Sequence, residues 1–144
     1  MLIQRINRSD PEKVFVVVKN SYTSAITVGM AVVWDSVTDQ DGVGVERPAT
    51  ASLNNFAGVV ETASIAAGDY GLIQVYGFNS NASGDGTTGA GAGDGLLIAN
   101  GSHDFILDAT EVSGAVGTIS PQVVLMEAYT TGAAAATKVF IKAM

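Results

Sequence analysis

Cysteine is absent from this 144-residue sequence, so neither a disulfide framework nor a thiolate metal site can form. His103 is the only histidine, which leaves no nitrogen–sulfur ligand set for a metal such as zinc. No apolar run approaches the roughly 20 residues that span a bilayer. The first residues also lack the apolar core of a signal peptide. We therefore expect a soluble protein, made in the cytoplasm, with no metal or other cofactor and no membrane partner.

Charged residues are scarce as well, at 15%, and they are unevenly placed. The first 19 residues carry four bases and two acids. From residue 20 to residue 137, Arg47 is the only base and stands against twelve acids. Because phosphate contacts require clustered lysine and arginine, nucleic acid is not expected as a partner. A surface of small, nearly neutral side chains suits burial against neighbouring subunits, which indicates a homo-oligomer or a larger assembly.

Helix signals are nearly absent, whereas β-branched and aromatic runs alternate with Gly, Asn, Asp and Ser clusters. This pattern predicts one all-β domain over residues 13–144, built as a small β-sandwich or barrel. The run Val14–Val18 is apolar throughout, as expected of a strand that is buried on both faces. The predicted strands are Val14–Lys19, Val28–Asp35, Val43–Arg47, Ala57–Glu61, Tyr70–Gly77, Leu96–Ala99, Asp104–Asp108, Gln122–Ala128 and Lys138–Lys142. The side chains expected in the core are Trp34, Val59, Ile73, Val75, Val124 and Phe140.

Two segments differ from the predicted core. Residues 1–12 are predicted to form an extended N-terminal arm, which mixes apolar and basic side chains and has no strand partner nearby in the sequence. Residues 77–95 contain seven glycines and are predicted to be a long loop. The arm is the candidate anchor for a partner protein, because an extended segment can add to an exposed strand edge. Its candidate contact residues are Leu2, Ile3, Arg5, Ile6 and Arg8.

Three short motifs suggest chemistry, but their context argues against it. Residues 84–89 match G-x-G-x-x-G, yet the glycines that follow cannot hold the helix that a dinucleotide site needs. Ser102, His103 and Asp104 are adjacent, so as neighbours on a strand they would point to opposite faces and form no catalytic relay. The Asp-rich stretch at residues 35–41 does not fit the spacing of a calcium loop, and Asp41-Gly42 is typical of a hairpin turn.

Two stretches of the sequence combine strand and turn patterns in a recognisable order. The first contains Val17-Val18-Lys19-Asn20 followed by residues 26–35, ITVGMAVVWD. The second contains Ala57-Gly58-Val59-Val60-Glu61 followed by residues 65–77, IAAGDYGLIQVYG. Together they resemble the small head decoration, or capsid cement, proteins of tailed bacteriophages. The resemblance covers about residues 14–78 and implies a β-rich fold of the sandwich, barrel or tulip type.

The resemblance also implies a function. It indicates a structural, non-enzymatic virion protein on the outer surface of a phage capsid, where it bridges neighbouring major capsid subunits. The implied partners are the major capsid protein and further copies of the chain, as a trimer in preference to a dimer.

Two alternative functions stay open. One is a carbohydrate-binding or adhesive module that uses the Gly-rich loop and a set of aromatic side chains. The weaker one is a dUTP pyrophosphatase-like enzyme, which the turn and strand at residues 65–73 faintly resemble. The aromatic side chains in question are Tyr22, Trp34, Tyr70, Tyr76 and Tyr129.

Overall fold

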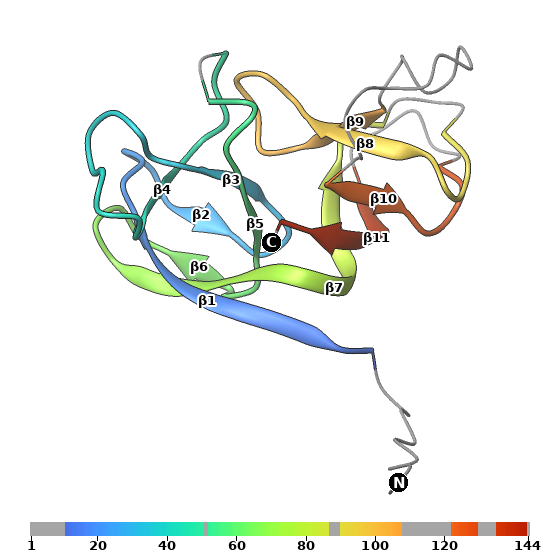
Figure 1. The fold of residues 1–144 in the computed structure, drawn as a ribbon, viewed down its shortest axis with the longest axis horizontal. Helices are drawn as coiled ribbons and strands as arrows, with labels where there is room; N and C mark the ends of the chain where they lie inside the picture. The colour runs from blue at the N-terminus through green and yellow to red at the C-terminus, as the bar shows by residue number, and fades with distance from the viewer. Residues whose placement is uncertain (1–10, 51, 87–89, 108–121, 130–134, 144) are drawn as a thin grey trace, which may run out of the picture.

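The computed structural model of the protein (Figure 1) describes residues 11–50, 52–86, 90–107, 122–129 and 135–143. These residues form strands and connecting turns with no helix, which confirms the predicted all-β class. None of them forms a helix that is long and apolar enough to cross a membrane. The strands are β1 (Lys13–Asn20), β2 (Ile26–Thr27), β3 (Ala31–Trp34), β4 (Gly44–Glu46), β5 (Phe56–Val60), β6 (Ser64–Ile65), β7 (Tyr70–Gly84), β8 (Gly95–Ile98), β9 (Phe105–Leu107), β10 (Val123–Leu125) and β11 (Ala135–Lys142).

The long strand β7 organises the whole sheet. Nine strands follow one another in the order β1-β4-β3-β5-β7-β11-β10-β8-β9, and two additional pairings join β7 to β1 and to β9. The sheet therefore closes twice, into an N-terminal ring of β1, β4, β3, β5 and β7 and a C-terminal ring of β7, β11, β10, β8 and β9. Figure 1 shows β7 running from one ring into the other. Strands β2 and β6 form a separate small ribbon.

Each ring has its own hydrophobic core, and β3 and β5 form the wall between them. Val32 of β3 and Val60 of β5 belong to the core of the N-terminal ring, which also holds Val18 and Ile73. The neighbours Val33 and Val59 face the other core, together with side chains of β8 to β11. Both strands are consequently buried on both faces, which explains their uninterrupted apolar sequences.

The core prediction is correct in part. Val59, Ile73 and Val75 are buried as expected, but Trp34, Val124 and Phe140 are only partly buried. The residues on either side of Val124 in β10 and of Phe140 in β11 face the core instead. They are Val123, Leu125, Val139 and Ile141. Successive side chains of a strand point to opposite faces, so an error of one residue inverts the assignment.

The predicted loop over residues 77–95 begins too early, because β7 continues to Gly84 and pairs with β11 along this stretch. The glycine at position 77 allows a close approach between strands. Its φ is +102°, and a Cβ atom there would lie 1.9 Å from the carbonyl oxygen of Glu12. The glycines at residues 77 and 84 are thus part of a strand, and β8 begins at Gly95, the last residue of the predicted loop.

Candidate interaction surface

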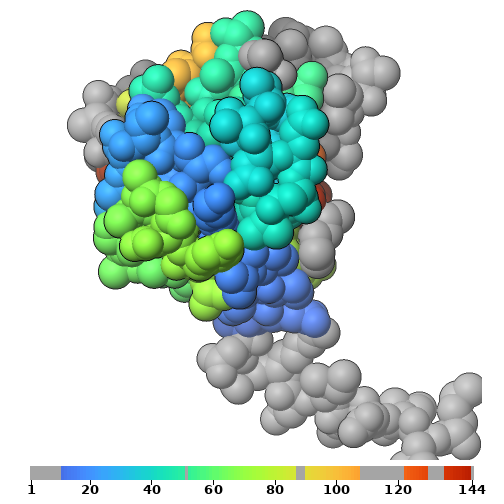
Figure 2. Space-filling model, turned by 90° about the vertical axis from the view of Figure 1, so that its left-hand side faces the viewer, coloured from blue at the N-terminus to red at the C-terminus, as the bar shows by residue number. Residues whose placement is uncertain are grey.

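An apolar surface covers the outer face of the ribbon that β1 and β7 form. Val17 lies directly opposite Leu72, and Lys19 lies opposite Tyr70. Phe15 is 41% exposed, Val17 58%, Tyr70 64% and Leu72 42%, so four large side chains are open to solvent on neighbouring positions. Figure 2 shows β1 in blue adjoining the light-green start of β7. We call these four residues the β1–β7 surface.

Two lysines of β1 lie near the ends of this surface. Lys19 Nζ is 3.0 Å from Asp39 Oδ2, and Lys13 Nζ is 3.9 Å from Glu61 Oε1. The hydrogen bond to Asp39 and the charge of that carboxylate raise the pKa of Lys19. Since Lys19 is already a cation at neutral pH, this shift keeps a positive charge at the end of the surface.

The prediction that β1 is buried on both faces is wrong, because Phe15 and Val17 are exposed. Sequence analysis therefore missed the β1–β7 surface. A signal for it existed in the alternation Lys13, Phe15, Val17, Lys19, which places a lysine at each end of one strand face.

The predicted anchor residues Leu2, Ile3, Arg5, Ile6 and Arg8 lie outside the described residues, so their role stays a prediction. The described chain leads from Pro11 and Glu12 directly into β1 at Lys13. The arm is thus joined in sequence to the strand that carries Phe15 and Val17.

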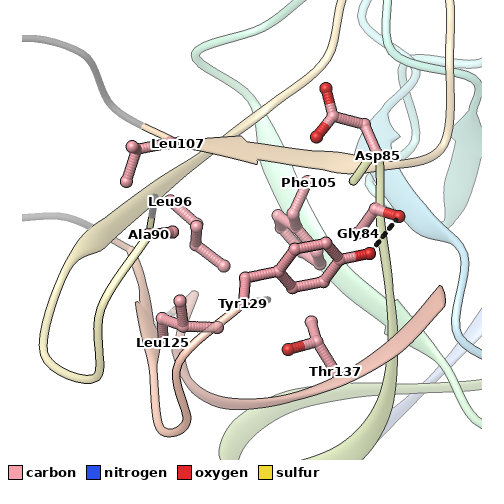
Figure 3. A pocket seen from close by; sticks show the side chains of 9 residues that line it. All are labelled: Gly84, Asp85, Ala90, Leu96, Phe105, Leu107, Leu125, Tyr129 and Thr137. Atoms are coloured by element: carbon pink, nitrogen blue, oxygen red, sulfur yellow. Dashed lines mark hydrogen bonds between the residues drawn. The ribbon is translucent and has the colours of Figure 1, made fainter. Parts of the chain in front are cut away.

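A small cavity lies in the C-terminal ring (Figure 3), lined by residues that include Leu96, Phe105, Leu125, Tyr129 and Thr137. The Tyr129 hydroxyl donates a hydrogen bond to the Gly84 carbonyl at 3.1 Å. The buried Thr137 hydroxyl has no hydrogen-bond partner within the part of the chain that the structure describes. The cavity volume is about 10 Å³, which is room for about one water molecule.

Ser102, His103 and Asp104 are adjacent, but the His103 ring turns away from the other two. Its Nδ1 donates to the Ala31 carbonyl at 2.8 Å, whereas the Ser102 hydroxyl donates to the Asp104 carboxylate. Burial lowers the pKa of His103 and keeps the ring neutral at pH 7. The three side chains therefore form no serine–histidine–aspartate relay. They lie in the bend before β9 and not on a strand, so the reason given from the sequence is wrong.

The aromatic side chains that could have formed a sugar-stacking face take part in different contacts. Tyr22 packs edge-on against His103, with ring centroids 5.8 Å apart, and Tyr76 packs edge-on against Phe140 at 5.3 Å. Tyr129 lines the cavity of the C-terminal ring, and Tyr70 belongs to the β1–β7 surface. Trp34 packs against the core of the N-terminal ring.

The Asp-rich stretch after β3 is a hydrogen-bonded turn. The buried Asp35 carboxylate accepts backbone N–H groups of Val37 at 3.0 Å, Thr38 at 2.8 Å and Asp39 at 3.2 Å. Strands β3 and β4 then pair antiparallel across a turn in which Gly42 has a φ of +79°. Within the described ranges, no group of three or more His, Asp or Glu side chains is placed to hold a metal ion.

Asp35 should make the stability of the fold depend on pH. Burial alone would raise the pKa of Asp35, but the three N–H donors outweigh it and lower the pKa below the ordinary 3.8. A carboxyl with a lowered pKa in the folded state stabilises the fold above pH ~4, and this contribution is lost as the pH falls further. We expect Asp35→Asn to lower the free energy of unfolding by about 1–2 kcal/mol at pH 7 and by less at pH 3. Urea unfolding at both pH values measures this. The exposed Asp69→Asn serves as the control, and equal effects of the two substitutions would contradict the assignment.

Comparison with known proteins finds no matching family model and no significant match among curated protein sequences.

Proposed function

We propose that this chain is a structural protein that binds the outer surface of a tailed-phage capsid and bridges neighbouring major capsid subunits. The observation that carries the proposal is the β1–β7 surface, where four large apolar side chains are exposed on one face of a strand pair. Contiguous exposed apolar side chains on a soluble protein mark interaction sites. The sequence resemblance over residues 14–78 includes all four residues of this surface and suggests the identity of the partner.

In this proposal, the N-terminal arm and the β1–β7 surface act together. The arm lies extended on the shell, with Leu2, Ile3 and Ile6 in shallow apolar pockets and Arg5 and Arg8 paired with carboxylates. The β1–β7 surface packs against the same or the adjacent capsid subunit. A protein that binds only the assembled shell stabilises the shell by mass action, without any catalytic step. Many copies, associated as trimers in preference to dimers, bridge the subunit junctions.

Binding to capsid shells tests the proposal and both parts of the contact. The probe is a shell assembled from the major capsid protein encoded in the same genome, and binding is measured by co-sedimentation. We expect deletion of residues 2–10 to abolish binding of a chain that still folds, and wild-type binding to weaken as salt rises, because the arginine contacts are screened. Val17→Ser should weaken binding about fivefold, since burial of half a valine side chain contributes about 1 kcal/mol.

The chain offers a matched control in Val37, which is 75% exposed and lies on the turn after β3, not on the β1–β7 surface. Val37→Ser removes the same exposed apolar group and should leave binding unchanged. If the wild-type chain does not bind the shells at all, the proposed function is wrong. If it binds and Val37→Ser weakens binding as much as Val17→Ser, the β1–β7 surface is not the contact.

A further inference from the structure

A lysine, an asparagine and a glutamate meet beside the start of β1. Lys13 Nζ lies 3.9 Å from Glu61 Oε1, and Asn79 Nδ2 donates a hydrogen bond to Glu61 Oε2 at 3.4 Å. Lys13 begins β1, Glu61 directly follows β5, and Asn79 lies in β7. One carboxylate therefore contacts an amine with one of its oxygens and a side-chain amide with the other.

The register of the sheet places Lys13 within reach of Asn79. Lys13 lies opposite Gly77 across the strand pair of β1 and β7, and Asn79 is two residues further along β7. Diagonal neighbours of this kind lie about 7–8 Å apart, which a long side chain can span. Gly77 has no side chain to stand between them. The Lys13 amine can therefore approach the amide carbon of Asn79 across the glycine.

The Asn79 amide is held in one orientation. The residue is 1% exposed, and its Nδ2 donates to Gln74 Oε1 at 3.0 Å as well as to Glu61. Its Oδ1 accepts the backbone N–H of Asn81 at 2.8 Å. A donor at this position stabilises the negative charge that develops on an amide oxygen when a nucleophile attacks the carbon. The Asn79 amide is thus positioned as an electrophile, with its nitrogen beside a carboxylate that can protonate it.

The other two side chains can supply the nucleophile and carry the protons. The side chains of Lys13 and Glu61 are 33% and 32% exposed, so water reaches this side of the group and a small product can leave. Lysine attacks carbonyl carbons as a neutral amine, after it has lost a proton to a neighbouring base. Glu61 is the carboxylate beside this amine. The lysine side chain has four rotatable bonds, and rotation about them brings Nζ into hydrogen-bond range of Glu61.

We propose that Lys13 and Asn79 form an intramolecular isopeptide bond and that Glu61 is the catalytic residue. The Lys13 ammonium gives a proton to Glu61, and the neutral amine attacks Cγ of Asn79. Oδ1 carries the negative charge of the tetrahedral intermediate. Glu61 then gives its proton to Nδ2 and takes one from the attacking nitrogen. The bond between Cγ and Nδ2 breaks, ammonia leaves, and Glu61 ends protonated. One amide replaces another, so the step requires no oxidant or reductant.

The bond ties β1 to β7 at the point where residues 1–12 enter the sheet. Force on the N-terminal arm pulls at the Lys13 end of β1, where the backbone hydrogen bonds to β7 would open one after another. A covalent link at Lys13 passes this force directly to β7, the strand that both rings share. Such a link suits an arm that anchors the chain, but its formation does not depend on the capsid or on any other partner.

Intact mass spectrometry of the folded full-length chain tests the proposal. We expect the wild-type chain to be lighter than its sequence by one ammonia, and a tryptic digest to contain a branched peptide that joins residues 13 and 79. Lys13→Arg keeps the charge but removes the nucleophilic amine, and Glu61→Gln removes the proton carrier. Both variants should keep the full sequence mass. Lys142→Arg, on an exposed position of β11, is the matched control and should lose ammonia as the wild-type chain does.

Two results would overturn the proposal. One is a folded wild-type chain that keeps its full sequence mass after prolonged incubation. The other is a loss of ammonia that persists in Lys13→Arg, because cyclisation at the exposed Asn100-Gly101 pair also releases ammonia. A bond that forms equally fast in folded Glu61→Gln would show that Glu61 is not catalytic. The branched peptide of the wild-type chain requires no variant, so it decides the matter even if Glu61→Gln fails to fold.

Discussion

Replacement of Gly29 by alanine is expected to lower the free energy of unfolding by about 3 kcal/mol or more. The φ of Gly29 is +88°, a conformation that costs a residue with a side chain about 1–2 kcal/mol. A Cβ atom at this position would also lie 2.1 Å from the carbonyl oxygen of Asn81 in β7. Gly29 has little freedom to move aside, because its N–H donates to the Val60 carbonyl and its carbonyl accepts the Ser83 N–H, both at 2.9 Å.

Gly68→Ala is the matched control for this substitution. Gly68 has nearly the same φ, +84°, but a Cβ atom there would meet nothing within 4 Å. We expect Gly68→Ala to cost only the conformational part, about 1 kcal/mol. Urea unfolding of the two variants and the wild-type chain separates the close backbone approach from the strain in φ. Equal losses in the two variants would show that the contact between residues 29 and 81 relaxes at little cost.

Most strands of this fold can be predicted from the sequence, because turn residues separate them clearly. Every predicted strand overlaps an observed one, and the turn at Asp41-Gly42 falls between strands as expected. The strand predicted from Val28 begins too early because Gly29 forms a turn, and β3 begins at Ala31. The two-residue strands β2 and β6 are too short to produce a periodic pattern in the sequence.

The extent of β7 and the position of the interaction surface could not be predicted in the same way. The segment from Asn79 to Gly84 consists of small and polar residues that favour turns, and only its pairing with β11 makes it a strand. In Val14–Val18 every residue is apolar, so the sequence does not reveal which face is exposed. That depends on which strands pack against β1, and on the second edge that β4 covers only at its end.

The amide pair of Gln74 and Asn79 fixes β7 in the region where the two rings meet. Both side chains are buried, and Asn79 Nδ2 donates to Gln74 Oε1 at 3.0 Å. Gln74 Nε2 donates in turn to two carbonyls of its own strand, those of Tyr76 at 3.1 Å and Phe78 at 3.0 Å. These carbonyls lie on either side of Gly77, where the backbone has a positive φ. The glutamine side chain therefore donates to the two carbonyls that flank the glycine at which β7 departs from regular strand geometry.

Replacement of Gln74 by methionine, which has a similar length but no hydrogen-bonding amide, should lower the free energy of unfolding by about 3 kcal/mol. The substitution removes the side-chain donor from two partly buried carbonyls and one acceptor from the Asn79 amide, which still donates to Glu61 Oε2 at 3.4 Å. Each buried group that loses its partner costs about 1–3 kcal/mol unless water reaches it. Gln40→Met is the matched control, because Gln40 is exposed and its amide donates to the carbonyl of Ser36 in the same exposed turn. We expect a change within about 0.5 kcal/mol there. Urea unfolding monitored by circular dichroism measures both variants.

Because the amide pair holds the strand shared by the two rings, loss of stability at Gln74 should affect both rings in a single unfolding transition. Separate transitions for the two rings would show that β7 does not couple them.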